Sequence, residues 1–332
     1  ASRLQWQCYV PTLSLLVTQD FGLDIVSVGY LYLYFVGASV VSSAGLSLHL
    51  NTWKLTPYTL LIGGYALRCL SGALHAAGCL LQAAGHTQYA FPMLCISRII
   101  HGYTLLLFPL TVVWIGTRMG PEQRPLALGA RNSWSTMGIF CGVLSGSILS
   151  AFAPSSLIAG MAPGWLNILV SLAMITWLCT SFVDRDSLPS KPPGEAVDQE
   201  EYVPWMHIMC VGWSQFSGWM GFVAIEGSLS LMMREFYGID HLSLWLIWIP
   251  VSGLMLAGTL GFAQFTKWKW PASRQATVAG SALGLATGLL LYGVFTTAPQ
   301  TKEVLRELDW QEHGISLSCL ICGIGLLLFA FA

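Results

Sequence analysis

The stretch "GWLNILVSLAMITWLCTSFVDRDSLPSKPPGEAVDQEEYV", residues 164–203, decides the fold. Its first half, 164–183, carries no charge and has the length of about twenty residues that an α-helix needs to cross a bilayer. Its second half, 184–203, holds three prolines, a glycine and eight charged residues. That composition is typical of an extended, solvated linker. We therefore interpret 184–203 as a cytoplasmic linker between two membrane-embedded halves.

The rest of the chain consists mainly of apolar runs of similar length. Hydrophobic residues make up 55% of the sequence and charged residues 9%, whereas about a quarter of a soluble domain is charged. The sequence predicts an all-α, polytopic membrane bundle, with an N-terminal half at 1–183 and a C-terminal half at 204–332. We expect about ten helices, at roughly 5–18, 26–47, 58–80, 90–116, 125–152, 163–183, 204–232, 242–265, 276–298 and 314–332.

The charges between the runs indicate an orientation. Lys and Arg concentrate in the loops after even-numbered spans, which predicts that these loops and the linker are cytoplasmic. The loops on the other side are rich in Asp and Glu, as expected of a luminal or extracellular side. The chain starts at Ala1 and stops inside the apolar run "GLLLFAFA", so we expect a fragment that lacks residues at both ends and has a truncated second half.

Glycines recur at every fourth position of the fifth and ninth expected spans: Gly138, Gly142 and Gly146, and Gly280, Gly284 and Gly288. Small residues at this spacing let the backbone of a neighbouring helix approach closely. We therefore predict tight helix packing along one face of each span. A sliding surface in a moving transporter remains the alternative.

Several function classes are excluded by composition. The net charge is −1 and no basic cluster occurs, which argues against a nucleic-acid partner. The nine cysteines lie in apolar runs, and the C-x-x-C at Cys319 and Cys322 has no further ligand nearby, so we expect neither a metal nor a cofactor. No His-rich, Ser/His/Asp or paired-Asp constellation occurs in the spans, so we do not expect an enzyme.

Four charged residues lie well inside the apolar runs: Arg68, Arg98, Arg131 and Glu226. A charge in the hydrocarbon core costs at least about 2.5–3.5 kcal/mol, so such residues normally face protein groups or a wet cavity. Arg68 lies about 16 Å along its span, near the bilayer midplane. Three guanidinium groups opposed by one acid favour an anion in a central cavity. Arg98 and Arg131 could instead bind backbone carbonyls or extend toward the membrane surface.

Three neighbours complete the candidate substrate-binding set. His101 lies one helical turn from Arg98 and either extends a hydrogen-bond network or serves as a satisfied core histidine. Asn132 and Trp134 lie close to Arg131 in the sequence.

Glu226 is the acid of the set. A straight helix would place it near the luminal interface, but Gly218, Gly221 and Gly227 could bend the helix toward the cavity. There the carboxyl group could take up protons or pair with an arginine as a gate.

Local motifs carry a family resemblance. The loop "GLSLHLNTWK", 45–54, has the length and end points of G-x-x-x-D-R-x-G-R-R/K, with His49 and Leu50 in place of the acid and the first arginine. The element "RIIHG", 98–102, looks like R-x-x-x-G, and 116–142 is similar to the loop and helix that follow it. Together with the linker, these motifs resemble the major facilitator superfamily. Val143 after Gly142 departs from the Gly-Pro pair of its antiporters.

The resemblance implies two six-helix halves that rock about a central site. Within the superfamily, "FVAIEGSLSLMMREFYGID", 222–240, and "LDWQE", 308–312, look most like one branch. That branch contains the neuronal ceroid lipofuscinosis endolysosomal chloride-pathway protein and the plant SPX-domain vacuolar phosphate transporters. It implies a lysosomal or vacuolar membrane.

The sequence thus predicts a secondary transporter, embedded in the lipid bilayer, that moves a small anionic solute by alternating access, with proton coupling through Glu226. Two alternatives stay open. One is an anion channel on the same scaffold. The other is a structural membrane subunit without transport, which the replacements at His49 and Leu50 favour. The identity of the solute and the oligomeric state are left undetermined.

Overall fold

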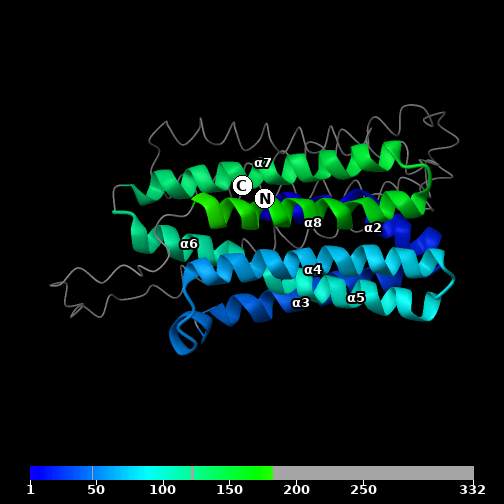
Figure 1. Cartoon of the computed structure of the whole chain (residues 1–332), viewed down its shortest axis with the longest axis horizontal. Helices are drawn as coiled ribbons and strands as arrows, with labels where there is room; N and C mark the ends of the chain where they lie inside the picture. Colours follow the sequence, from blue (N-terminus) through cyan, green and yellow to red (C-terminus); the bar gives the residue numbers. More distant parts are fainter. Residues whose placement is uncertain (47, 121–122, 182–332) are drawn as a thin grey trace, which may run out of the picture. The chain divides into compact units, whose positions relative to one another are not determined.

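The computed structural model describes residues 1–181 with the exception of 47, 121 and 122. The linker, Glu226 and the glycines at 280, 284 and 288 lie outside the described residues, which Figure 1 draws in colour. Every regular element in the described part is helical, as predicted.

The helices form six successive spans that match the six expected before the linker to within a few residues at most ends. Their elements are α1 (Ser2–Gln7), α2 (Val10–Leu15) and the π-helical η1 (Leu16–Asp20); α3 (Ile25–Ala44); α4 (Pro57–Ala83); α5 (Thr87–Tyr103), the 3-10 turn η3 (Thr104–Leu106) and α6 (Leu107–Arg118); α7 (Arg124–Phe152); and α8 (Ser156–Ser181). A short π-helical turn, η2 (Leu48–Thr52), lies in the loop before α4. Five of the spans are long and apolar enough to cross a membrane.

Side-chain caps fix where two of the spans begin. The Asp24 carboxylate accepts a hydrogen bond from the backbone N–H of Ser27 at 3.0 Å, at the start of α3. The Thr56 hydroxyl accepts one from Thr59 N at 3.1 Å, and Pro57 follows at the first position of α4, where its missing N–H costs no hydrogen bond. These residues end the polar loops and start the apolar spans.

The helix contacts confirm the predicted packing of the fifth span. The α4 helix packs against α5 and α8 (Figure 1), α3 packs against α5, and α1 packs against α7. A methyl group at Gly142 would lie 2.5 Å from the carbonyl oxygen of Leu4, and one at Gly146 would clash with the carbonyl oxygen of Cys8. The glycine face of α7 therefore receives the backbone of α1.

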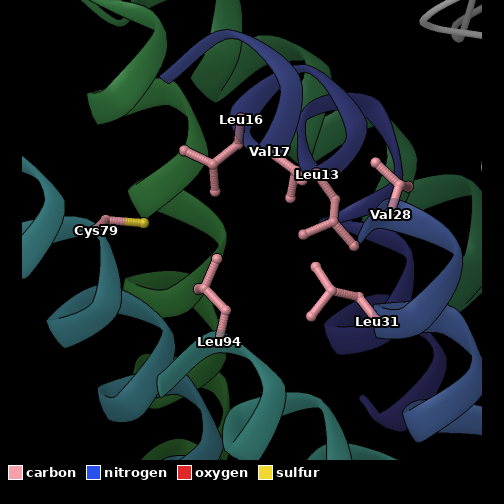
Figure 2. Packing of buried hydrophobic residues seen from close by; sticks show 7 residues of the cluster. All are labelled: Leu13, Leu16, Val17, Val28, Leu31, Cys79 and Leu94. Atoms are coloured by element: carbon pink, nitrogen blue, oxygen red, sulfur yellow. The ribbon is translucent and has the colours of Figure 1, made fainter. Parts of the chain in front are cut away.

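Two apolar clusters occupy the two ends of this half. Leu13, Leu16, Val17, Val28, Leu31, Cys79 and Leu94 form the first cluster, near the α4–α5 turn (Figure 2). Leu46, Leu60, Tyr65, Leu106, Leu107, Leu110 and Leu178 form the second, near the start of α4. Between them, α4 and α5 carry buried polar residues, so a polar layer lies between two apolar ones.

Candidate functional site

Arg68 is wholly buried near the middle of α4 and binds two other spans. Its Nε donates to the Thr104 hydroxyl at 2.9 Å, and its Nη1 donates to the carbonyl oxygen of Ser2 at 2.7 Å and to Oε1 of Gln5 at 2.9 Å. Its Nη2 has no hydrogen-bond partner among the described residues. Arg68 thus ties the first turn of the chain to α4 and to the end of α5.

Arg98 is buried on α5 and is held by a histidine and a tyrosine ring. Its Nη2 lies 3.1 Å from Nδ1 of His75, and Nε2 of His75 lies 2.8 Å from the carbonyl oxygen of Gly160. A guanidinium nitrogen can only donate and a carbonyl oxygen can only accept, so His75 is neutral and carries its hydrogen on Nε2. The guanidinium carbon also lies 3.8 Å from the ring centre of Tyr9, a cation–π contact.

His101 connects these groups. Its Nδ1 lies 3.3 Å from Nδ2 of Asn167, and the same amide nitrogen lies 3.1 Å from the hydroxyl of Tyr9. The Nε2 of Gln5, whose Oε1 accepts from Arg68, donates to the backbone carbonyl oxygen of Asn167 at 3.0 Å. We call Arg68, Arg98, His101 and their partners Gln5, Tyr9, His75 and Asn167 the buried polar network. His101 is a buried core histidine at the edge of these hydrogen bonds, and its Nε2 has no hydrogen-bond partner among the described residues.

The buried polar network contains two cations and neutral partners. In residues 1–181, neither Arg68 nor Arg98 contacts a carboxylate; both bind carbonyl, amide, hydroxyl or imidazole groups and an aromatic face. A buried charge needs such hydrogen bonds, because water is absent to solvate it. These two arginines therefore lie inside the first half and hold its helices together.

Arg131 lies elsewhere, on α7, at the wall of a cavity of about 160 Å³. Its Nε donates to the Thr111 hydroxyl at 3.3 Å, its Nη1 to Oδ1 of Asn132 at 2.9 Å and its Nη2 to the carbonyl oxygen of Phe108 at 2.9 Å. The predicted bond to a backbone carbonyl is therefore present, and the same side chain also borders the cavity. Trp134 lines the cavity as well.

A second arginine borders this cavity. The guanidinium carbon of Arg3 lies 4.5 Å from the ring centre of Phe108, and that of Arg131 lies 3.6 Å from the same centre. No carboxylate is among the described residues that line the cavity. We call it the arginine cavity; its lining is Ala1, Ser2, Arg3, Leu61, Tyr65, Leu107, Phe108, Thr111, Arg131, Trp134 and Ser135.

The lining residues lie at one depth in the bundle. Tyr65 is about 12 Å from the start of α4, Thr111 about 10 Å from the end of α6 and Arg131 about 10 Å from the start of α7. These three helix ends belong to the side that the basic loop residues indicate as cytoplasmic. Along these helices, the arginine cavity therefore lies between the buried polar network and the ends that the loop charges predict to be cytoplasmic.

The predicted site residues thus fall into two groups. Arg68, Arg98 and His101 belong to the buried polar network, and Arg131, Asn132 and Trp134 lie at or beside the arginine cavity. Ser2 joins the groups, because its carbonyl oxygen binds Arg68 and its atoms line the cavity. Glu226 lies outside the described residues.

Sequence reasoning missed Arg3 and Phe108. The apolar run that predicted the first span begins at about residue 5, whereas α1 begins at Ser2 and brings Arg3 into the bundle. A contact between Arg3 and an aromatic ring about a hundred residues away has no local signal. The one hint in the sequence was that Phe108 falls in the fourth predicted span, at the same cytoplasmic end as Arg131.

The loop before α4 shows how the chain replaces the acid of the family motif. His49 is buried in η2, and its Nε2 lies 2.7 Å from the hydroxyl of Tyr103 at the end of α5. Its ring also packs on Trp53, with centroids 4.6 Å apart. A hydrogen bond within the first half thus stands where the motif has a charged residue.

Comparisons with known proteins agree with this architecture. The chain resembles the nucleoside transporter NupG, with a TM-score of 0.58 at 13% identity, over 99% of this chain and 77% of that one. It also resembles a bacterial homologue of the human lysosomal transporter Spinster, with a TM-score of 0.59 at 14% identity, over 99% and 72% of the two chains. The chain is also similar to a bacterial homologue of the iron transporter ferroportin, with a TM-score of 0.58 at 16% identity, over 99% of this chain and 80% of that one. At these identities the likeness concerns the fold.

No curated protein sequence matches the chain. The family model described as Major Facilitator Superfamily matches residues 1–332, the full length of the sequence. The match agrees with the six described spans and with the motifs at 45–54 and 98–102. The arginine cavity and the buried polar network therefore lie in the first half of a multi-pass membrane protein that belongs to the major facilitator superfamily.

Proposed function

We propose that this membrane transport protein moves a small anionic solute, which binds in the arginine cavity. The observation that carries the proposal is the pair of guanidinium groups of Arg3 and Arg131 over one aromatic ring, in a cavity whose described lining holds no carboxylate. Arginine cannot give up its charge under physiological conditions, so both guanidinium groups stay positively charged.

The magnitude of the repulsion supports an anionic occupant. The guanidinium carbons lie 4.5 and 3.6 Å from the Phe108 ring centre and so are at most about 8 Å apart, where like charges repel by about 2 kcal/mol at an effective dielectric constant of about 20. An anion bound in the cavity near both groups is attracted by each of them. A neutral solute gains none of this energy, so the cavity discriminates by charge.

In this proposal the buried polar network does not contact the solute but holds in place the residues that do. Arg68 binds the carbonyl oxygen of Ser2, the residue next to Arg3, and so fixes the turn that brings Arg3 to the cavity. Arg98 and His101 hold α5 to α4 and α8 through His75 and Asn167. The sequence predicted that Arg68, Arg98 and His101 bind the solute. We propose instead that they hold in place the helices that form the arginine cavity.

Uptake into proteoliposomes tests the proposal. The purified chain is reconstituted and supplied with labelled benzoate, acetate, phosphate and chloride, with choline and glucose as cationic and neutral solutes. We expect saturable uptake of at least one anion, and a loss of about tenfold or more in Arg131→Ala, because a hydrogen bond to a charged group contributes about 1.5–3 kcal/mol. Uptake of choline or glucose but no anion would refute the proposal.

A matched control comes from the same helix. Arg124 is exposed at the start of α7, where its Nε donates to the carbonyl oxygen of Met119 at 2.8 Å, and it does not line the cavity. Arg124→Ala also removes one positive charge, but it should keep anion uptake within about twofold of the wild type, because salt and water screen the field of an exposed charge outside the cavity. Equal losses in both variants would mean that overall charge, not the cavity, sets the rate.

Proton coupling through Glu226 and an acidic organelle remain part of the proposal, supported by the sequence alone. Uptake should rise as the donor side is acidified, and Glu226→Gln should flatten this dependence. The channel alternative predicts currents that follow the ion gradient at rates beyond any rocking cycle. The structural-subunit alternative predicts no flux of any solute in the same vesicles.

A further inference from the structure

We infer that the solute of the arginine cavity carries a carboxylate group on a flat, apolar body. This inference rests on the proposed function, which leaves the class of anion open. It follows from the hydrogen-bond donors that Arg131 keeps and from the composition and size of the walls around them.

Arg131 keeps two donors. A guanidinium group has five N–H groups, one on Nε and two on each terminal nitrogen. The Nε donor is used by Thr111, one Nη1 donor by Asn132 and one Nη2 donor by the Phe108 carbonyl oxygen. Within the described part of the chain these are its only hydrogen-bond partners, so one N–H remains on each terminal nitrogen.

Two such donors on adjacent nitrogens suit an acceptor with two oxygens. Carboxylates and phosphates bind arginine in this paired geometry, whereas a halide has a single acceptor centre and gains little from it. Arg131 is also held in place before any solute arrives, by the three hydrogen bonds and by its contact with the Phe108 ring. Less side-chain freedom is then lost on binding.

The other walls favour a carboxylate over a phosphate. Leu61, Leu107, Tyr65, Phe108 and Trp134 give the arginine cavity apolar and aromatic surfaces. The Thr111 hydroxyl is already engaged, since it accepts from Arg131 and donates to the Phe108 carbonyl oxygen at 2.8 Å. A carboxylate has two oxygens for the two remaining N–H groups of Arg131. A phosphate has further charged oxygens, which would need Ser2, Arg3 or Ser135 as partners to avoid the desolvation cost of lying against Leu61, Leu107 and Phe108.

The cavity is large enough for a solute of this kind. Its volume of about 160 Å³ has room for on the order of ten water-sized groups, because one water needs about 10–15 Å³ by the same measure. Benzoate has about as many non-hydrogen atoms as the cavity has room for water-sized groups, and its planar ring can stack on Phe108 or Trp134. Benzamide has the same shape without the charge.

Binding and uptake of benzoate test the inference. We expect benzoate to raise the melting temperature of the purified wild-type chain and to enter proteoliposomes saturably, while benzamide, chloride and phosphate do neither. Arg131→Lys keeps the charge but loses the paired donors, so benzoate uptake should fall about tenfold or more. The melting-temperature measurement on the wild-type chain tests the inference even if this variant does not fold.

Three outcomes separate the inference from the function on which it rests. Benzoate binding and uptake that Arg131→Lys reduces would support both. Uptake of chloride or phosphate with no response to benzoate, or benzoate uptake that Arg131→Lys leaves unchanged, would overturn the carboxylate inference and leave anion transport standing. Absence of uptake of any anion, with choline or glucose transported, would overturn both.

Discussion

Replacement of Gly142 by alanine should destabilise the first half by moving α1 away from α7. The added methyl group would lie 2.5 Å from the Leu4 carbonyl oxygen and 2.7 Å from Cβ of Gln7, where normal carbon contacts lie at about 3.5–4.0 Å. Because backbone atoms are involved, a side-chain rotation cannot relieve the clash. The α1 backbone must shift instead.

The net free-energy change has two contributions of opposite sign. Overpacking of this kind costs about 1–3 kcal/mol, whereas alanine in a helix is more favourable than glycine by about 0.5–1 kcal/mol. We therefore expect Gly142→Ala to lose up to about 2.5 kcal/mol of stability. At about 2–4 °C per kcal/mol, the melting temperature should fall by a few degrees.

Alanine replacements at two further glycines on α7 should have smaller effects on stability, so the three variants form a graded series. A methyl group at Gly138 would meet Cβ of Arg3 at 3.3 Å, so Gly138→Ala should change the stability little. Gly129 has no described atom within 4 Å of such a methyl group, so Gly129→Ala should keep or raise the melting temperature.

The assay is the melting temperature of the full chain in detergent, followed by tryptophan fluorescence. The expected order, from highest to lowest, is Gly129→Ala, Gly138→Ala and Gly142→Ala. If Gly142→Ala melts at or above the temperature of Gly129→Ala, the packing of α1 on the glycine face is wrong.

Two other predictions concern buried hydrogen bonds. Asn167→Ala removes the amide nitrogen 3.1 Å from the hydroxyl of Tyr9 and should cost about 1–3 kcal/mol by the same melting assay, because buried partners lose their hydrogen bonds. Asn132→Ala, at an exposed asparagine, should cost less than about 0.5 kcal/mol, and equal losses would contradict the account. Tyr103→Phe removes the hydroxyl 2.7 Å from Nε2 of His49 and should speed hydrogen exchange in η2; unchanged exchange there would show that this bond does not hold the turn.

The spans of the first half were predictable because a bilayer allows few solutions. An apolar run of about twenty residues has to be a helix there, so the ends of α3, α4 and α7 were within a few residues of expectation. The glycine face of α7 was predictable for a similar reason, since the spacing of four defines one side of a helix.

The direction of each arginine was not predictable. The sequence places Arg68 at the right depth, but which neighbours it meets depends on the rotation of α4 about its axis, and the packing against α5 and α8 sets that rotation. The same holds for Arg131, because Arg3 and Phe108, which line its cavity, come from other spans. The turn η3 was missed although Pro109 marks it, because a proline has no N–H to bond the carbonyl oxygen of Leu105, four residues earlier and inside η3.

That turn lies within one continuous helical span, Thr87–Gly116. Before it, α5 carries Arg98 and His101 of the buried polar network, and after it α6 carries Phe108 of the arginine cavity. Because the hydroxyl of Thr104 accepts a hydrogen bond from Arg68, the turn between them is bound to α4. A single span therefore supplies residues to both groups, and its attachment to α4 lies between them.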